Sequence, residues 1–113
     1  MECDLFLKNG TIVDGTGSRP FPGHIAVKNG KVLAVIPAGP KTIVSAWQAS
    51  ELVDCTGLMV CPGFIDSHSH LDFLLTLPEH PELVKSFIEQ GITTVIGGNC
   101  GFSPTPWPEG SPY

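Results

Sequence analysis

The feature that most constrains the fold is a strand–helix–strand pattern in the second half of the chain. An apolar run at residues 58–61 resumes at residues 63–65, and a β-branched run follows at residues 93–96. Continuous apolar runs are typical of strands that are buried on both faces of a parallel sheet. Between them, the apolar spacing of residues 81–90 predicts a helix that Gly91 ends. The pattern therefore predicts one β-α-β unit with parallel strands.

The first half of the chain is predicted to form short antiparallel strands. Asn9-Gly10 and Asn29-Gly30 each stand between apolar runs. This dipeptide is the strongest short-range signal for a hairpin, because both residues tolerate a positive φ. Residues 51–54 predict a further strand, and the 13 glycines and 11 prolines agree with frequent turns. These features favour a small antiparallel sheet or half of a β-sandwich.

Charge and cysteine content exclude several classes of partner. Six basic and eleven acidic residues give a net charge of −5, so no basic surface for nucleic acid or an anionic membrane is expected. The chain begins without a signal-peptide pattern, and no apolar run reaches the ~18 residues of a membrane span. The four cysteines form no C-x-x-C pair and are expected to be reduced thiols in a cytoplasmic protein. Cys3, Cys55 and Cys61 are interpreted as small apolar side chains.

Two histidines follow the first predicted parallel strand. His68 and His70 stand at positions i and i+2, which lie about 6–7 Å apart on one side of an extended chain. Both imidazoles can therefore converge on one metal ion. The alternative is a pair of solvated surface histidines. The metal site is favoured, because ligands bind at the carboxyl ends of strands in parallel α/β sheets.

A cysteine follows the second predicted strand. Cys100 lies in a glycine-rich turn at residues 97–101. Because the two strands are expected to be parallel, Cys100 and the histidine pair are predicted to emerge at the same edge of the sheet. A thiolate beside two imidazoles is a donor set that zinc accepts. The alternative is a buried apolar cysteine in a tight turn.

Four further polar residues need an interpretation. Asp66 and Asp72 flank the histidine pair, and each could orient a histidine through a hydrogen bond. A solvated loop carboxylate is the alternative for both. His24 and His80 stand in turn-like surroundings and are predicted to be surface residues.

Motifs that occur in order along the chain resemble the amidohydrolase superfamily of metal-dependent hydrolases. Residues 9–17 (N-G-T-I-V-D-G-T-G) and 62–70 (P-G-F-I-D-S-H-S-H) are similar to the opening of that superfamily. Residues 91–95 (G-I-T-T-V) and 98–103 (G-N-C-G-F-S) resemble the D-aminoacylase branch, the N-acyl-D-amino-acid deacylases. The resemblance covers roughly residues 4–104.

The resemblance implies a mixed α/β fold. An N-terminal antiparallel β-sandwich portion at residues 1–57 would precede the first β-α-β segment of a truncated (β/α)8 TIM barrel at residues 58–113. A complete barrel takes about 200–250 residues. The chain is therefore expected to be an amino-terminal fragment of the enzyme, inactive by itself.

The resemblance also implies the chemistry. Zinc would be held by His68, His70 and Cys100, and a metal-activated water would hydrolyse the amide of a small-molecule N-acyl-D-amino acid. The catalytic aspartate of the branch has no counterpart in this chain, nor have its later barrel histidines.

Two alternatives remain open. One is another amidohydrolase, such as a dihydroorotase-like cyclic amidase, although relatives of that kind more often rely on a lysine-derived bridging group than on the G-N-C-G block. The other is a non-catalytic truncated module that binds metal. The substrate side chain, the acyl group, the number of metals and the presence of a homo-oligomer are left open by the sequence.

Overall fold

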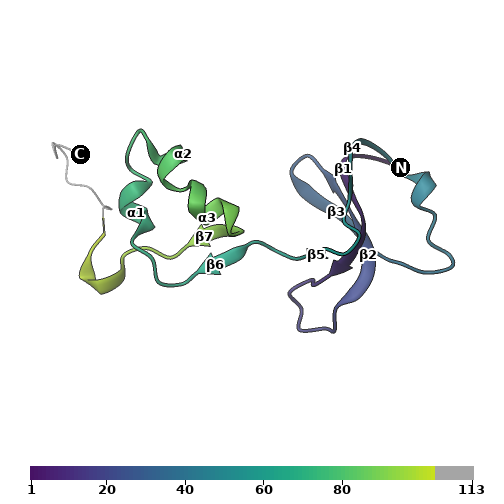
Figure 1. Ribbon diagram of the computed structural model, residues 1–113, viewed down its shortest axis with the longest axis horizontal. Helices are drawn as coiled ribbons and strands as arrows, with labels where there is room; N and C mark the ends of the chain where they lie inside the picture. The colour runs from purple at the N-terminus through teal and green to yellow at the C-terminus, as the bar shows by residue number, and fades with distance from the viewer. Residues whose placement is uncertain (104–113) are drawn as a thin grey trace. The chain divides into compact units, whose positions relative to one another are not determined.

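The computed structural model describes residues 1–103 and divides the chain into two compact units, Met1–Pro62 and Gly63–Tyr113 (Figure 1). The first unit is built on one sheet, and the second combines a strand pair with short helices. The protein is thus a mixed α/β protein, as predicted. Residues 104–113 of the expected barrel segment lie outside the described residues.

A five-stranded sheet forms the first unit, in the order β3-β2-β1-β4, with β5 also pairing with β1. The elements are β1 (Glu2–Ile12), β2 (Phe21–Lys28), β3 (Lys31–Pro37), the 3-10 helix η1 (Val44–Ala46), β4 (Gln48–Asp54) and β5 (Met59–Val60). The pairs β1–β2 and β2–β3 are antiparallel, whereas β4 and β5 run parallel to β1. The prediction that the strands of residues 1–57 are antiparallel is therefore wrong for β4. The long connection at residues 38–47 carries the chain back to the other end of the sheet, which a parallel partner requires.

Only the second Asn-Gly pair forms the predicted hairpin. Asn29 and Gly30 have φ of 52° and 71° and join β2 to β3. Asn9-Gly10 instead lies inside β1, where Asn9 has a φ of 62° and the pairing register with β2 shifts. This is a β-bulge. The prediction of a first hairpin is wrong, because a bulge and a tight turn both call for a residue that tolerates positive φ.

The core of the first unit surrounds Phe6. Its ring stacks on His24, with 5.9 Å between centroids, and on Trp47, with 5.7 Å. His24 is only 5% exposed, so the prediction of a surface histidine is wrong. Its Nδ1 accepts the backbone N–H of Asn9 at 3.0 Å, which satisfies the donor at the bulge.

The cysteines are free thiols that differ in burial. Cys3 and Cys55 are buried, as expected for small apolar side chains. Cys61 is exposed, which contradicts that interpretation at this position. It lies just after β5, where the chain leaves the sheet.

The boundary between the two units falls at Pro62 and Gly63, and not at residues 57 and 58 as expected. The apolar run at residues 58–61 does not belong to the second sheet. Its strand β5 pairs with β1, and the Val13 N–H donates to the Val60 carbonyl at 2.9 Å. The run therefore belongs to the first sheet, through the pairing of Met59 and Val60 with β1.

The second unit contains the predicted parallel pair. Strands β6 (Phe64–Asp66) and β7 (Ile92–Val95) are parallel, and the helices α1 (Leu71–Leu74), α2 (His80–Leu83) and α3 (Lys85–Glu89) lie between them in the chain (Figure 1). A 3-10 helix, η2 (Asn99–Gly101), follows β7. Among residues 1–103, no helix has the length and apolar character needed to cross a bilayer.

The helix expected at residues 81–90 is broken into α2 and α3 at Val84. Val84 ends α2 and precedes α3, and it is the only buried residue of that segment. A short helix depends on tertiary packing of a whole apolar face, and a β-branched residue adds little helix propensity. One buried side chain is therefore not enough to hold a continuous helix here.

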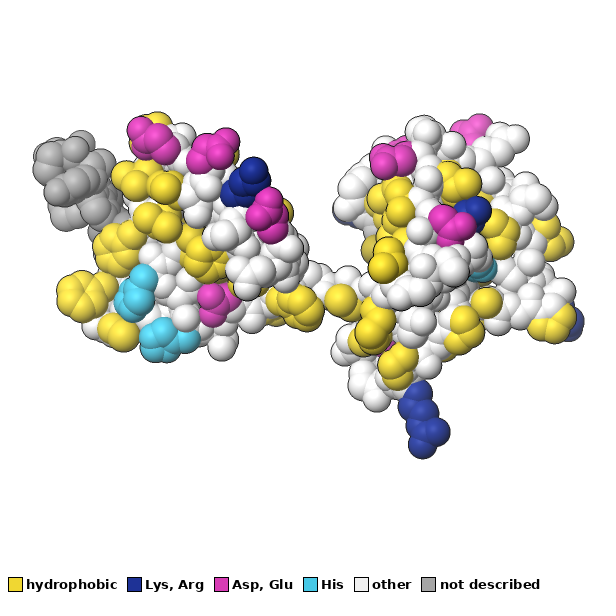
Figure 2. All heavy atoms as spheres, viewed as in Figure 1, with side chains coloured by type: hydrophobic (Ala, Val, Ile, Leu, Met, Phe, Trp, Pro, Cys, Tyr) yellow, Lys and Arg dark blue, Asp and Glu magenta, His cyan; other side chains and the backbone are white. Residues whose placement is uncertain are grey.

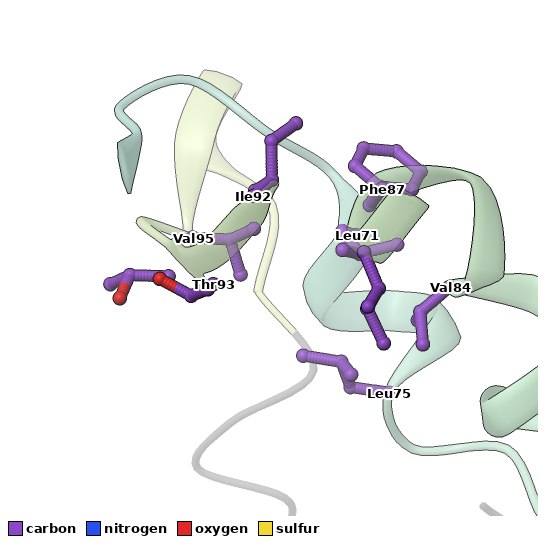
Figure 3. A pocket seen from close by; sticks show the side chains of 9 residues that line it. Leu71, Leu75, Val84, Phe87, Ile92, Thr93 and Val95 are labelled. Atoms are coloured by element: carbon purple, nitrogen blue, oxygen red, sulfur yellow. The ribbon is translucent and has the colours of Figure 1, made fainter. Parts of the chain in front are cut away.

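Hydrophobic side chains remain at the surface of both units (Figure 2). Phe64 and Ile65 of β6 are 58% and 65% exposed, although the sequence predicts a buried strand. A cavity of about 360 Å³ lies between the helices and β7. Figure 3 shows Leu71 and Phe87 on the helix side of this cavity and Ile92 on the strand side. The helices thus cover the strand pair incompletely within the described residues.

Candidate metal centre

The histidine pair lies on the loop between β6 and α1. Asp66 ends β6, and its Oδ1 accepts the backbone N–H of His68 at 3.2 Å. The side-chain oxygen of Ser69, which is buried, accepts the N–H of Leu71 at 3.1 Å. These two local hydrogen bonds shape the loop and leave both imidazoles exposed, with 6.0 Å between the ring centroids.

Cys100 lies in the tight turn that follows β7. It has a φ of 57°, in the left-handed region that a residue with a Cβ rarely adopts. Gly98 and Gly101 on either side also have positive φ. The glycines let the chain fold back sharply, and the turn brings the thiol toward the histidine loop.

The three predicted ligands come together. The Sγ of Cys100 lies 3.6 Å from Nε2 of His68, and the candidate ligand atoms of His68, His70 and Cys100 all lie within 4.8 Å of one another. In a tetrahedral zinc site, ligand atoms at about 2.0–2.3 Å from the metal are themselves about 3.3–3.7 Å apart. The distance between Cys100 Sγ and His68 Nε2 matches that spacing, and nitrogen and sulfur donors are those that zinc prefers.

The two aspartates do not contact a histidine ring in the way the sequence suggests. Asp66 bonds to the backbone of His68. Asp72, on α1, accepts the N–H of Gly98 with its Oδ2 at 2.9 Å, and its Oδ1 is buried without a hydrogen-bond partner among the described residues. Both carboxylates therefore hold backbone segments that carry the candidate ligands.

Sequence reasoning assigned no role to Asn99. Its side-chain amide donates to the carbonyl of Ser69 at 3.0 Å and to that of Ile96 at 2.6 Å. The position of an asparagine between a glycine and the candidate ligand was the available signal. Nothing in the sequence indicates that its partner lies on the other loop. His80 is exposed, as predicted, and its Nδ1 lies 3.0 Å from the Leu77 carbonyl oxygen.

A comparison with models of protein families shows which family the chain belongs to. Residues 51–112 match the model of the amidohydrolase family. The chain belongs to the amidohydrolase family. The matched segment contains His68, His70 and Cys100, so the cluster is part of the region that identifies this amidohydrolase.

Two individual relatives show which members of the family the chain is similar to. The amidohydrolase is 36% identical to a D-aminoacylase of Alcaligenes xylosoxydans xylosoxydans over 110 residues, which cover 96% of this chain and 21% of that protein. It is 34% identical to an adenine deaminase of Halalkalibacterium halodurans over 95 residues, covering 84% of this chain and 15% of that protein.

Among solved structures, the amidohydrolase is similar to N-acyl-D-glutamate deacylase from Bordetella bronchiseptica, crystallised with zinc and a phosphonate inhibitor. The TM-score is 0.77 at 36% identity, over 94% of this chain and 20% of that one. The resemblance to the D-aminoacylase branch is confirmed. The chain spans about a fifth of the length of these deacylases.

Proposed function

We propose that this chain is the amino-terminal part of a zinc-dependent amidohydrolase that hydrolyses the amide bond of N-acyl-D-amino acids. The observation that carries the proposal is the cluster of His68, His70 and Cys100, whose candidate ligand atoms lie within 4.8 Å of one another after two parallel strands. The similarity to D-aminoacylase and to a zinc-containing N-acyl-D-glutamate deacylase supports the substrate class.

The residues present fit a zinc ion, and each has a definite part. His68 and His70 offer ring nitrogens, and Cys100 offers a thiolate. Asp66 holds the backbone of the histidine loop at His68. The chemistry that zinc supplies when bound is Lewis acidity toward an amide carbonyl and an attacking water.

The remaining parts of the reaction are assigned to the rest of the complete protein. The parallel pair β6–β7 is proposed as the first two strands of a (β/α)8 barrel, and the sheet of residues 1–62 as one layer of a β-sandwich. The exposed Phe64 and Ile65 of β6 support this assignment, because a barrel strand is covered on both faces. The aspartate that moves a proton is placed in that further chain, as the resemblance implies.

A deacylase is favoured over a deaminase by the extent of the similarity. The D-aminoacylase match covers 96% of this chain, whereas the adenine deaminase match covers 84%. The deacylase structure extends the same similarity to 94% of the chain in three dimensions. The free thiols of all four cysteines support the expected cytoplasmic location.

The test uses the complete protein that contains this chain. We expect release of free amino acid from N-acyl-D-amino acids, little from the matching L-enantiomers, and one or more zinc ions per protein. His68→Ala is expected to abolish turnover, and His80→Ala, an exposed histidine outside the cluster, is the matched control. Ammonia release from adenine, or ring opening of a cyclic amide, without acyl hydrolysis would overturn the proposal in favour of those activities.

A further inference from the structure

Two side chains tie the turn that carries Cys100 to the segment that carries the histidines. Resting on the metal site proposed above, we propose that Asp72 and Asn99 are positioning residues that hold the Cys100 sulfur beside His68 and His70 before a metal arrives. Neither side chain belongs to the group of candidate ligands. Both side chains bind backbone atoms, so they affect the site by positioning the turn that carries Cys100 relative to the loop that carries the histidines.

Asp72 supports the turn from α1. Its Oδ2 accepts the Gly98 N–H at 2.9 Å across 26 positions of sequence, and a hydrogen bond to a charged acceptor is stronger than one between neutral groups. The turn also lies directly against this side chain. A Cβ added at Gly97 would stand 2.5 Å from Oδ2 and 2.7 Å from the Cβ of Asp72. Asp72 therefore holds the turn by a hydrogen bond at Gly98 and by close contact at Gly97.

Asn99 supports the same turn through hydrogen bonds of its own side chain. One amide nitrogen donates to the Ser69 carbonyl at 3.0 Å and to the Ile96 carbonyl at 2.6 Å, which uses both of its hydrogens. Ser69 is buried and stands between the two histidines. The amide thus joins the middle of the histidine loop to the end of β7.

The backbone of Cys100 explains why such support is needed. Its φ of 57° is unfavourable for a residue with a Cβ, so an unsupported turn would relax toward negative φ. That relaxation would rotate the Cα–Cβ bond and carry the sulfur away from His68. The hydrogen bonds of Asp72 and Asn99 stand directly before Cys100, at Gly98 and at residue 99 itself.

The experiment compares zinc affinity and cobalt spectra in the complete protein. The variants are Asp72→Ala, Asp72→Asn and Asn99→Ala, with Asp14→Ala as a matched control. Asp14 also accepts a backbone N–H, that of Thr16 at 3.0 Å, but in the first unit. Zinc dissociation constants come from competition with a chromophoric chelator. The thiolate-to-cobalt(II) charge-transfer band reports whether the Cys100 sulfur binds the metal.

We expect Asp72→Ala and Asn99→Ala to raise the zinc dissociation constant about 10–100-fold and to weaken the charge-transfer band. Asp72→Asn keeps an oxygen acceptor for the Gly98 N–H and is expected to restore most of the affinity. Asp14→Ala should behave as wild type. Unfolding curves of the metal-free proteins identify any variant that fails to fold.

A second pair of variants keeps the inference testable if Asp72→Ala does not fold. Gly97→Ala forces the turn away from Asp72 and should weaken the band, whereas Gly39→Ala meets only one atom, at 4.0 Å, and should not. The inference would be overturned if Asn99→Ala and one of the other two variants, folded Asp72→Ala or Gly97→Ala, both kept the wild-type zinc affinity and charge-transfer band. The metal site itself would still stand in that case. A wild type that binds zinc no better than Cys100→Ala would overturn the site itself.

Discussion

The sulfur of Cys100 lies 3.6 Å from Nε2 of His68, although 32 positions of sequence separate the two residues. The contact exists because β6 and β7 are parallel and each is followed directly by a segment that carries a candidate ligand. Cys100 makes this contact from a left-handed backbone conformation, with a φ of 57°. The cluster thus combines a favourable topology with a locally unfavourable residue.

Replacing Cys100 is expected to separate stability from metal binding. Cys100→Gly removes the Cβ from the position with φ 57°, so the metal-free protein should be about 1 kcal/mol more stable than Cys100→Ala. Both variants should bind zinc equally poorly and lose activity with it. Urea unfolding of the metal-free proteins and zinc titration measure the two effects. Equal unfolding free energies for the two variants would show that the turn does not keep its positive φ.

The 113-residue chain by itself is expected to hydrolyse no N-acyl-D-amino acid, even with added zinc. The described residues supply the ligand cluster, and the proton-transferring aspartate is assigned to further chain. Amino acid release by the isolated chain is measured against the complete protein at equal concentration. Turnover that disappears in His68→Ala would contradict this expectation.

His24 is expected to matter for stability and not for catalysis. His24→Phe keeps an aromatic ring on Phe6 but leaves the backbone N–H of Asn9 without its acceptor. This hydrogen bond is partly buried, and losing such a bond costs about 0.5–1.5 kcal/mol, so the free energy of unfolding should fall by about that amount. His80→Ala, at an exposed site, should change it by less than about 0.5 kcal/mol. Denaturant midpoints compare the two, and equal midpoints would count against the buried role of His24.

Asp54 is expected to make the free energy of unfolding depend on pH in the acid range. Hydrogen bonds from the Thr56 hydroxyl and N–H, and then from Asn9, hold the pKa of this carboxyl well below its usual range, with Lys8 nearby. Because the pKa is lowered in the folded state, the stabilisation is complete above the unfolded value of about 3.9 and is lost as the pH falls toward the folded pKa.

Asp54→Asn should therefore unfold at lower urea concentration than wild type at pH 6, and the difference should shrink as the pH falls below about 4. Glu51→Gln, on the same strand β4 and also exposed, is the control. If the difference in unfolding urea concentration between wild type and Asp54→Asn stayed constant as the pH fell from 6 to below about 4, the lowered pKa of Asp54 would not be its cause.

The parallel pair and the meeting of the three candidate ligands after it could be predicted from the sequence, because both rest on local patterns. The β-branched run at residues 93–96 directly indicates a strand. The i, i+2 spacing of His68 and His70 indicates that both side chains lie on the same side of the chain. That Cys100 follows the second strand then requires only that the strands be parallel. The grouping of His68, His70 and Cys100 was therefore accessible from pattern and topology.

Other features depend on contacts that no local pattern encodes. Asn9-Gly10 forms a bulge instead of a turn because β1 continues beside β2 and β4. His24 is buried because its ring stacks on Phe6 and its Nδ1 accepts the backbone N–H of Asn9. The bond from Gly98 to Asp72 joins residues 26 positions apart. Such partners are selected by tertiary packing, and a residue type alone does not name them.

The parallel pairing of β6 with β7 has a consequence for folding as well as for chemistry. Its register places Asp66 beside Val95, so the segments after both strands begin at the same level. A slip by one residue would shift the histidine loop by about 3.3 Å along the strand and turn alternate side chains to the opposite face. An ion that needs all three donors would bind the slipped chain weakly. A metal bound at the proposed site would therefore stabilise the correctly paired register over the slipped one.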